Sequence, residues 1–357
     1  MQDLLRRFSF DVICRVSLGV DPGCLDPALP APRLAAAFDA AAGIIARRGA
    51  APVAAVWKAK HALDLGSERR LREEISVIHE AVMDLIHTRK KERALVNGGD
   101  GRRSDLLSRM IECGYPDEAI RDMVISFIMA GRDTTSSALT WFFWLLTRHR
   151  DVEREVLREI AGGASHAAGG QGKMRVLHAA LCETMRLYPP VAWDSKHAAA
   201  GDVLPDGTRV GCGDRVTYFQ YGMGRMESIW GADAAEFSLQ RWLSLPEDSA
   251  PPAAVAGVSP FKYPVFQAGP RTCLGKEMAF VQMKFVASTV LRRFELVPVD
   301  EGRVPVFLPL MTAHMAGGLN VTVRSRGDQI AAAAAAAGSK PVAAAGTPQL
   351  STPSASS

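Results

Sequence analysis

The sequence is poor in cysteine, and none of its six cysteines lies in a C-x-x-C motif or a regular paired spacing. This arrangement excludes a zinc ribbon and a disulfide scaffold, and it favours a reducing compartment. A long uninterrupted apolar run is also missing, because Arg132 and Asp133 break the most apolar stretch, residues 123–146, at its centre. Each of these charges would cost about 2.5–3.5 kcal/mol inside a bilayer. The stretch is therefore predicted to be a buried core helix, and no signal or transit peptide is visible before it.

The charge balance does not favour a nucleic-acid-binding protein. The formal net charge is only +4, and the basic residues of the segment 68–94 are interspersed with glutamates, as on a solvated helix face. A less favoured interpretation is a basic surface that steers an acidic electron donor. With 48% hydrophobic and 22% charged residues, the chain is expected to be a soluble globular protein.

Residues 326–357 are rich in Ala, Ser and Pro and are expected to form a disordered tail after one domain at 1–325. Helical patterns dominate the first half of that domain, and a few strands follow. The predicted helices cover residues 3–20, 32–48, 68–94, 104–113, 117–148, 151–160, 174–188 and 276–293. The predicted strands lie in a hairpin at 203–210 and at 215–219, 295–299 and 319–324. Because strands and helices do not alternate, a doubly wound nucleotide-binding sheet is not favoured, and the predicted fold class is mainly α with a small β component.

The most informative segment runs from Phe266 to Gly275 and reads F-Q-A-G-P-R-T-C-L-G. It places Cys273 in a Gly-rich loop just before a predicted helix, where free backbone N–H groups and the helix dipole favour a thiolate. The glycines leave room for a flat ligand, and Arg271 is suited to bind a carboxylate of that ligand. Together these features indicate haem held by a proximal cysteine.

A second unusual segment, Ala130-Gly131-Arg132-Asp133-Thr134-Thr135, interrupts the apolar helix. Glycine, an acid and two hydroxyls all lower helix stability there. Thr134 is predicted to hydrogen-bond the carbonyl of Ala130, and Gly131 to let a flat ligand approach the backbone. Asp133 needs an ionic partner or a proton-conducting role. Such exceptions inside a strong helix are expected at a functional site.

Both segments resemble motifs of the cytochromes P-450, namely F-x-x-G-x-R-x-C-x-G and A/G-G-x-D/E-T-T/S. The resemblance implies the cytochrome P-450 fold and a haem b cofactor, with Cys273 as the iron ligand and Arg271 on a propionate. Phe266, Gly275, Gly131 and Ala130 are implied to line the haem. Thr134 is implied to hydrogen-bond iron-bound dioxygen, and Asp133 to relay protons.

The same resemblance implies a structural network behind the cysteine loop. Glu183 and Arg186 lie three residues apart on one predicted helix and so share a face. Family members carry a later arginine that meets this pair, and Arg241 is the candidate. The family pattern at that point is P-E-R-F/W, from which Leu239 and Gln240 depart.

Segments at 186–196, 220–231 and 261–269 resemble the plant fatty-acid and oxylipin ω-hydroxylase branch. The implied substrate is a lipid-like molecule, a fatty acid or a jasmonoyl amino-acid conjugate, with Val191, Ala192 and Trp193 as contact candidates. Implied partners are O₂ and a flavoprotein reductase that passes on electrons from NADPH. The protein is expected to be a monomer at the cytosolic face of the endoplasmic reticulum, or soluble in the cytosol.

The resemblance begins partway through the family pattern. It implies that the anchor, most of the β-sheet and the first helices of the fold are missing. One alternative is therefore a catalytically inactive fragment that binds haem weakly or not at all. Another is a cysteine-nucleophile enzyme that uses Cys273, for which His314 is the nearest candidate base.

Overall fold

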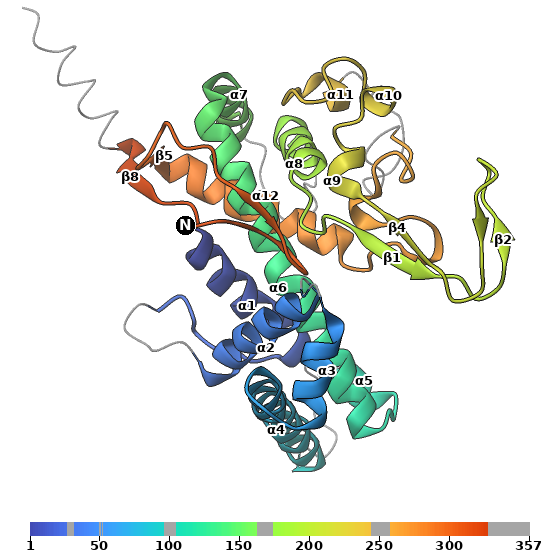
Figure 1. The fold of residues 1–357 in the computed structure, drawn as a ribbon. Helices are drawn as coiled ribbons and strands as arrows, with labels where there is room; N and C mark the ends of the chain where they lie inside the picture. The colour runs from blue at the N-terminus through green and yellow to red at the C-terminus, as the bar shows by residue number, and fades with distance from the viewer. Residues whose placement is uncertain are drawn as a thin grey trace, which may run out of the picture.

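The fold is mainly helical with a small β component, as predicted (Figure 1). A computed structural model describes residues 1–26, 32–49, 51, 53–95, 105–162, 174–243 and 258–327. The expected disordered tail lies almost entirely outside this part of the chain. The helices are α1 (Gln2–Leu18), α2 (Arg33–Gly49), α3 (Ala54–Ala62), α4 (Ser67–Leu95), α5 (Leu106–Glu112), α6 (Asp117–Arg148), α7 (Arg150–Ala161), α8 (Arg175–Leu187), α9 (Gln220–Met223), α10 (Glu227–Trp230), α11 (Gln240–Leu243) and α12 (Lys276–Arg293).

The strands pair antiparallel, two at a time. These pairs are β1 (Asp194–His197) with β4 (Arg215–Tyr218), β2 (Asp202–Val203) with β3 (Arg209–Val210), β5 (Phe294–Pro298) with β8 (Val321–Ser325), and β6 (Phe307–Pro309) with β7 (Ala313–Met315). In Figure 1 the β1–β4 and β2–β3 pairs extend to one side, away from the N-terminal helices.

The predicted bounds of the helices are correct to within two residues, and those of α6 and α12 are identical to the prediction. The prediction missed the short helices α3, α9, α10 and α11 and the strands β1, β6 and β7. Helix α3 buries no described side chain, so it has no apolar stripe that a periodic pattern would show. Strands β6 and β7 have three residues each and pair with each other across a short turn, so they are too short to show an alternating pattern.

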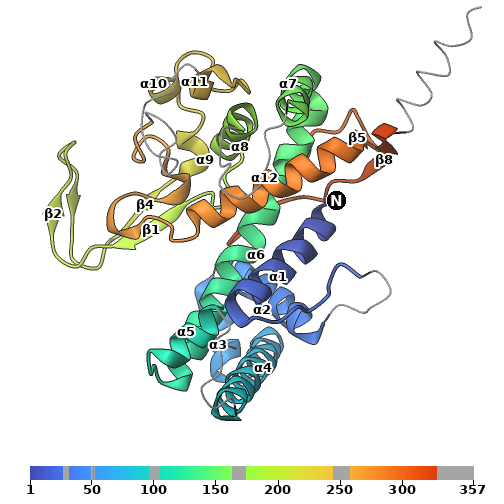
Figure 2. The same ribbon diagram turned by 180° about the vertical axis from the view of Figure 1, so that it is seen from behind.

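Helix α6 contributes a series of side chains to each of the two hydrophobic cores of the molecule, and α1 also contributes to both (Figure 2). Its first half packs Ile120, Val124 and Ile128 with α1, α2, α4 and α5. Its second half, from Ala138 to Leu146, packs with α7, α8 and α12. The stretch between Ile128 and Ala138 contributes to neither core, and this is the stretch that carries the unusual polar motif. No helix in the described ranges has the length and hydropathy that a membrane crossing requires.

Asp105 caps the start of α5 and joins it to α4. Its carboxylate accepts a hydrogen bond of 2.9 Å from the Ser108 N–H and one of 2.6 Å from Arg89 Nη1. Burial alone would raise the pKa of Asp105, but the Ser108 N–H and the Arg89 guanidinium outweigh it, and the pKa lies below the usual value. Arg89 also donates to the carbonyl of Leu18, so the cap ties α4 to the end of α1.

We expect Asp105→Ala to lower the free energy of unfolding by about 1–2 kcal/mol at neutral pH, the usual range for a lost N-cap. A carboxyl with a depressed folded-state pKa stabilises the fold above its unfolded pKa, and this contribution disappears as pH falls through the folded pKa. The difference between variant and parent should therefore shrink when pH is lowered from neutral to below the unfolded carboxyl pKa of about 3.9. Urea unfolding at both pH values measures it, and a constant difference would contradict the assignment.

Candidate functional site

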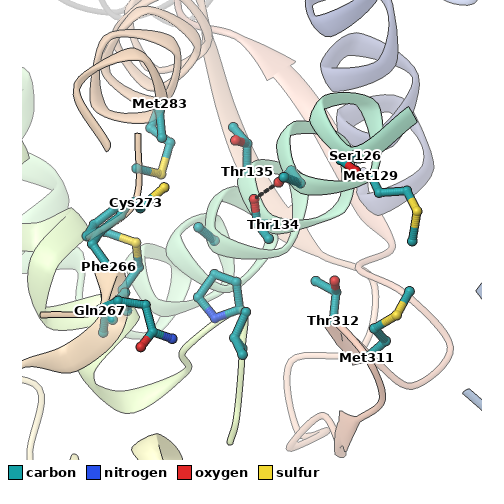
Figure 3. Close-up of a pocket in the computed structure, with 17 residues that line it drawn as sticks. Ser126, Met129, Thr134, Thr135, Phe266, Gln267, Cys273, Met283, Met311 and Thr312 are labelled. Atoms are coloured by element: carbon teal, nitrogen blue, oxygen red, sulfur yellow. Dashed lines mark hydrogen bonds between the residues drawn. The ribbon is translucent and has the colours of Figure 1, made fainter. Parts of the chain in front are cut away.

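A cavity of about 500 Å³ lies between the middle of α6 and the loop that carries Cys273 (Figure 3). Thr134 and Ala130 line the α6 side, and Cys273 and Phe266 line the opposite side. These four predicted site residues come together although about 130 residues separate the two segments. Most of the remaining wall is apolar, formed by Met129, Ala138, Met185, Pro190, Val191, Val265, Ala279, Met283 and Met311.

The cysteine loop is built from two short turns followed by α12. A 3₁₀ turn ends at Phe266, and the Phe266 carbonyl accepts a hydrogen bond of 2.9 Å from the Cys273 N–H. Gly275 is the N-cap of α12, and a Cβ placed on it would lie 3.8 Å from the Cys273 sulfur. The loop therefore holds an exposed thiol at the start of an 18-residue helix.

Thr134 behaves as predicted, because its hydroxyl donates a hydrogen bond of 2.7 Å to the Ala130 carbonyl (Figure 3). The bond gives the Thr134 hydroxyl an acceptor within the helix, while the side chain remains at the cavity wall. Thr140 makes the same bond to Ser136 one turn and a half further on, but it is fully buried and does not line the cavity.

Gly131 and Asp133 face α1 and not this cavity. A Cβ on Gly131 would lie 2.7 Å from Cδ1 of Ile13, so the glycine serves close packing of α6 against α1 instead of the expected approach of a flat ligand. Asp133 Oδ1 lies 3.6 Å from Arg6 Nε and 3.8 Å from Arg132 Nε. The acid therefore has ionic partners but no hydrogen bond to them, since Asp133 Oδ1 and the two Nε atoms are buried without a hydrogen-bond partner in the described ranges.

Arg271 and His314 lie outside the cavity wall. Arg271 ends the second short turn and is exposed, and within the described ranges no ion pair involves it. Its guanidinium is therefore available to an external carboxylate. His314 lies in β7 with Nδ1 2.6 Å from the Thr312 carbonyl, and it does not reach the cavity that Cys273 lines. This geometry gives no support to a Cys273–His314 pair.

The structure brings Glu183, Arg186 and Arg241 together. Glu183 and Arg186 are fully buried and form a bidentate ion pair with two bonds of 2.7 Å. Arg241 Nε lies 3.3 Å from Glu183 Oε1. The same carboxylate also accepts the Trp242 indole N–H at 2.9 Å and the Ser238 N–H at 2.8 Å.

Arg186 uses its remaining N–H groups on backbone carbonyls. The carbonyl oxygens of Ala234 and Glu236 accept hydrogen bonds of 2.6 Å and 2.8 Å from Arg186, and the Gly224 carbonyl accepts a third. Every charged atom of the pair is thus hydrogen-bonded, which a buried ion pair needs in order to offset its loss of hydration. The departures at Leu239 and Gln240 leave this geometry intact, and Leu239 itself is buried in the core.

The residues at the cavity fit a haem. The small side chains of Ala130, Ala138 and Ala279 leave space for a flat apolar ring between α6 and the cysteine loop. One thiol at the wall matches axial cysteine ligation of haem iron. Gly275 beside the sulfur would tolerate close approach of a ring edge.

Sequence reasoning missed Gln267, Met283, Met311 and Thr312, which also line the cavity. Of the predicted substrate-contact residues, Val191 lines it, whereas Ala192 is buried elsewhere and Trp193 is 44% exposed. Met311 and Thr312 come from the β6–β7 turn, and no sequence pattern connects that turn to Cys273. Gln267 lies inside the recognised motif at a position where the motif allows any residue.

The family model for cytochrome P-450 matches residues 1–319. Two Arabidopsis thaliana proteins, cytochrome P-450 94B1 and cytochrome P-450 94B3, are each 56% identical over 328 residues, which are 91% of this chain and 64% of theirs. Cytochrome P-450 94A2 of Vicia sativa is 46% identical over 331 residues with the same coverage. The chain therefore spans slightly less than two thirds of the length of these relatives.

We expect Gly224→Ala to disrupt the Glu183–Arg186 network. A Cβ on Gly224 would lie 2.1 Å from the Arg186 carbonyl oxygen, a contact that only a backbone shift can relieve. The Gly224 carbonyl would then leave Arg186, and the free energy of unfolding should fall by about 2–4 kcal/mol. Thermal or urea unfolding measures the change.

Gly201→Ala is the matched control, because its Cβ would meet only the Val210 carbonyl at an ordinary 3.7 Å. Equal stability of the Gly224 and Gly201 variants would show that the close approach to Arg186 has no energetic importance.

Proposed function

The chain belongs to the cytochrome P-450 family, and from this premise we propose that the protein is a haem-thiolate monooxygenase. It would insert one oxygen atom from O₂ into a terminal or near-terminal C–H bond of a fatty acid or a jasmonoyl amino-acid conjugate. The observation that carries the proposal is the shared cavity of Cys273 and Thr134, two residues that separate motifs contribute. Electrons would come from NADPH through a flavoprotein reductase at the cytosolic face of the endoplasmic reticulum.

When bound, haem b would supply the iron centre at which dioxygen is activated. Cys273 would hold that iron as a thiolate, with Phe266 and Gly275 beside it and Arg271 on a propionate. Thr134 would place a hydroxyl proton at the cavity wall opposite the sulfur, after its bond to the Ala130 carbonyl is released. Asp133 would hold a proton for transfer towards Thr134. The apolar wall would exclude water from the reacting C–H bond.

The shape of the apolar surface supports an elongated aliphatic substrate. A second cavity of about 200 Å³ lies between α2, α4 and α6 and shares Met129, Met311 and Thr312 with the first. Its other apolar wall residues include Phe38, Ile45, Ile75 and Ile78. An alkyl chain that ends near Thr134 could therefore continue past the two methionines into this second space.

We expect Cys273→Ser to abolish the thiolate-type absorbance of the reduced carbon monoxide complex, because an alcohol does not replace a thiolate as the iron ligand. The measurement is an absorbance spectrum of protein supplied with hemin and then reduced under carbon monoxide. Cys212→Ser is the matched control, since Cys212 is also a free exposed cysteine but does not line the cavity. An unchanged spectrum in the Cys273 variant would exclude the assignment, and parent protein that stays colourless with hemin would favour the inactive-fragment alternative.

We expect Met311→Trp to narrow the junction of the two cavities and to weaken binding of long-chain fatty acids. The dissociation constant should rise roughly tenfold, the scale of the 1–3 kcal/mol that overpacking costs, while short-chain acids bind as before. Leu310→Trp is the control, because Leu310 has a similar exposure and lines neither cavity. Equal effects on long and short chains would contradict a continuous alkyl path.

A further inference from the structure

Gln267, next to Phe266 in the cysteine loop, has a backbone conformation that side-chain-bearing residues rarely adopt. Its φ is 62° and its ψ is 177°, a combination essentially restricted to glycine. Of the residues that the structure describes, only Asp64 shares a positive φ without being glycine. Such a conformation persists only where the surroundings determine it.

Both polar atoms of the Gln267 side-chain amide hydrogen-bond to residues of the β1–β4 strand pair. Its Nε2 donates a hydrogen bond of 3.1 Å to Asp194 Oδ2 in β1. The Tyr218 hydroxyl, at the end of β4, lies within hydrogen-bond distance of both Gln267 Oε1 and Asp194 Oδ2. The Asp194 carboxylate is itself fixed by the Ser195 N–H at 2.7 Å and by Lys196.

The strained residue lies between the two groups that close the cysteine loop. Gln267 follows Phe266 directly, and the Phe266 carbonyl accepts the Cys273 N–H at 2.9 Å. The next turn then runs from Gly269 to Arg271, with Thr272 bonded back to the Gly269 carbonyl by both its N–H and its hydroxyl. A change in the φ of Gln267 would rotate the Phe266 carbonyl and open the bond to Cys273.

We propose that Gln267 is a positioning residue for Cys273, and that Asp194 and Tyr218 form a latch that keeps its strained backbone in place. The latch acts through the Phe266 carbonyl and touches neither the sulfur nor a ligand. The inference rests on the proposed function only in treating the Cys273 loop as the part of the site that binds the cofactor.

Two substitutions at Gln267 separate strain from anchoring. Gln267→Ala keeps a Cβ in the strained conformation but removes the latch, so hydrogen exchange of the Cys273 amide should accelerate about tenfold or more, the scale of two lost hydrogen bonds. Gln267→Gly also removes the latch, but glycine adopts this conformation without strain, so exchange should stay within about threefold of the parent. Exchange is measured in the full chain by NMR or fragmentation mass spectrometry.

A charge swap tests the contact with Asp194. Gln267→Glu places two carboxylates side by side and should accelerate exchange at Cys273. Adding Asp194→Asn to that variant restores a donor–acceptor pair and should return the rate towards that of the parent. Ser195→Ala is the control, because it removes a bond of 2.8 Å to Thr217 from the same strand pair without touching Gln267.

Equal acceleration in the Ala and Gly variants, or none in the Ala variant, would overturn the proposal. Should Gln267→Ala fail to fold, Tyr218→Phe tests the proposal instead, because it leaves Gln267 in place. It should accelerate hydrogen exchange of the Cys273 amide about fivefold, and no acceleration would overturn the proposal. In the variants supplied with hemin, the share of thiolate-type carbon monoxide complex should fall in the same order. Hydrogen exchange is measured without haem, so an exchange pattern that contradicts the latch leaves the proposed function standing. Parent protein that stays colourless with hemin would overturn the proposed function but not the latch.

Discussion

The continuity of α6 is the constraint on which the rest of the structure depends. This single helix contributes side chains to two hydrophobic cores, one through Ile120–Ile128 and the other through Ala138–Leu146. The turns between the cores are then free to carry polar chemistry. Three of the exceptions there have a local solution: Thr134 bonds to Ala130, Gly131 accommodates Ile13, and buried Arg132 pairs with Asp39 at 2.5 Å. The motif interrupts the apolar pattern without interrupting the helix.

The wall opposite α6 is fixed by the charge pair behind it. The Trp242 indole bonds Glu183, and its ring packs against Tyr263 with centroids 5.0 Å apart. The Tyr263 hydroxyl in turn donates to the Cys182 carbonyl in α8 at 3.0 Å. Tyr263 directly precedes the turn that ends at Phe266. The buried pair therefore acts mainly by fixing the positions of these side chains, since a buried ion pair by itself adds little net stability.

The features that local sequence patterns determine could be predicted from the sequence. The bounds of α6 and α12 follow from apolar periodicity, and the Thr134 bond follows from the chemistry of a hydroxyl in a helix. The cavity wall that comes from the β6–β7 turn and from Pro190 and Val191 could not be predicted in this way. Met311 lines the same cavity as Cys273 because the β6–β7 turn folds back to the segment that follows α8, where the Ala313 N–H donates to the Pro190 carbonyl at 2.7 Å. The direction of Gly131 depends on how α1 crosses α6, which no residue near Gly131 encodes.

The orientation of Asp133 changes how a proton route through this site has to be understood. Adjacent helix residues point about 100° apart, so an acid beside Thr134 in sequence faces a different neighbour in space. Here that neighbour is the pair of guanidinium groups on Arg6 and Arg132, and Asp133 borders the smaller cavity while Thr134 borders the larger. Direct transfer between the two side chains is therefore not possible in this conformation. In the proposed reaction a proton would therefore have to pass after rotation of the Asp133 side chain or through a bridging water, and the ion pair with α1 would oppose that rotation.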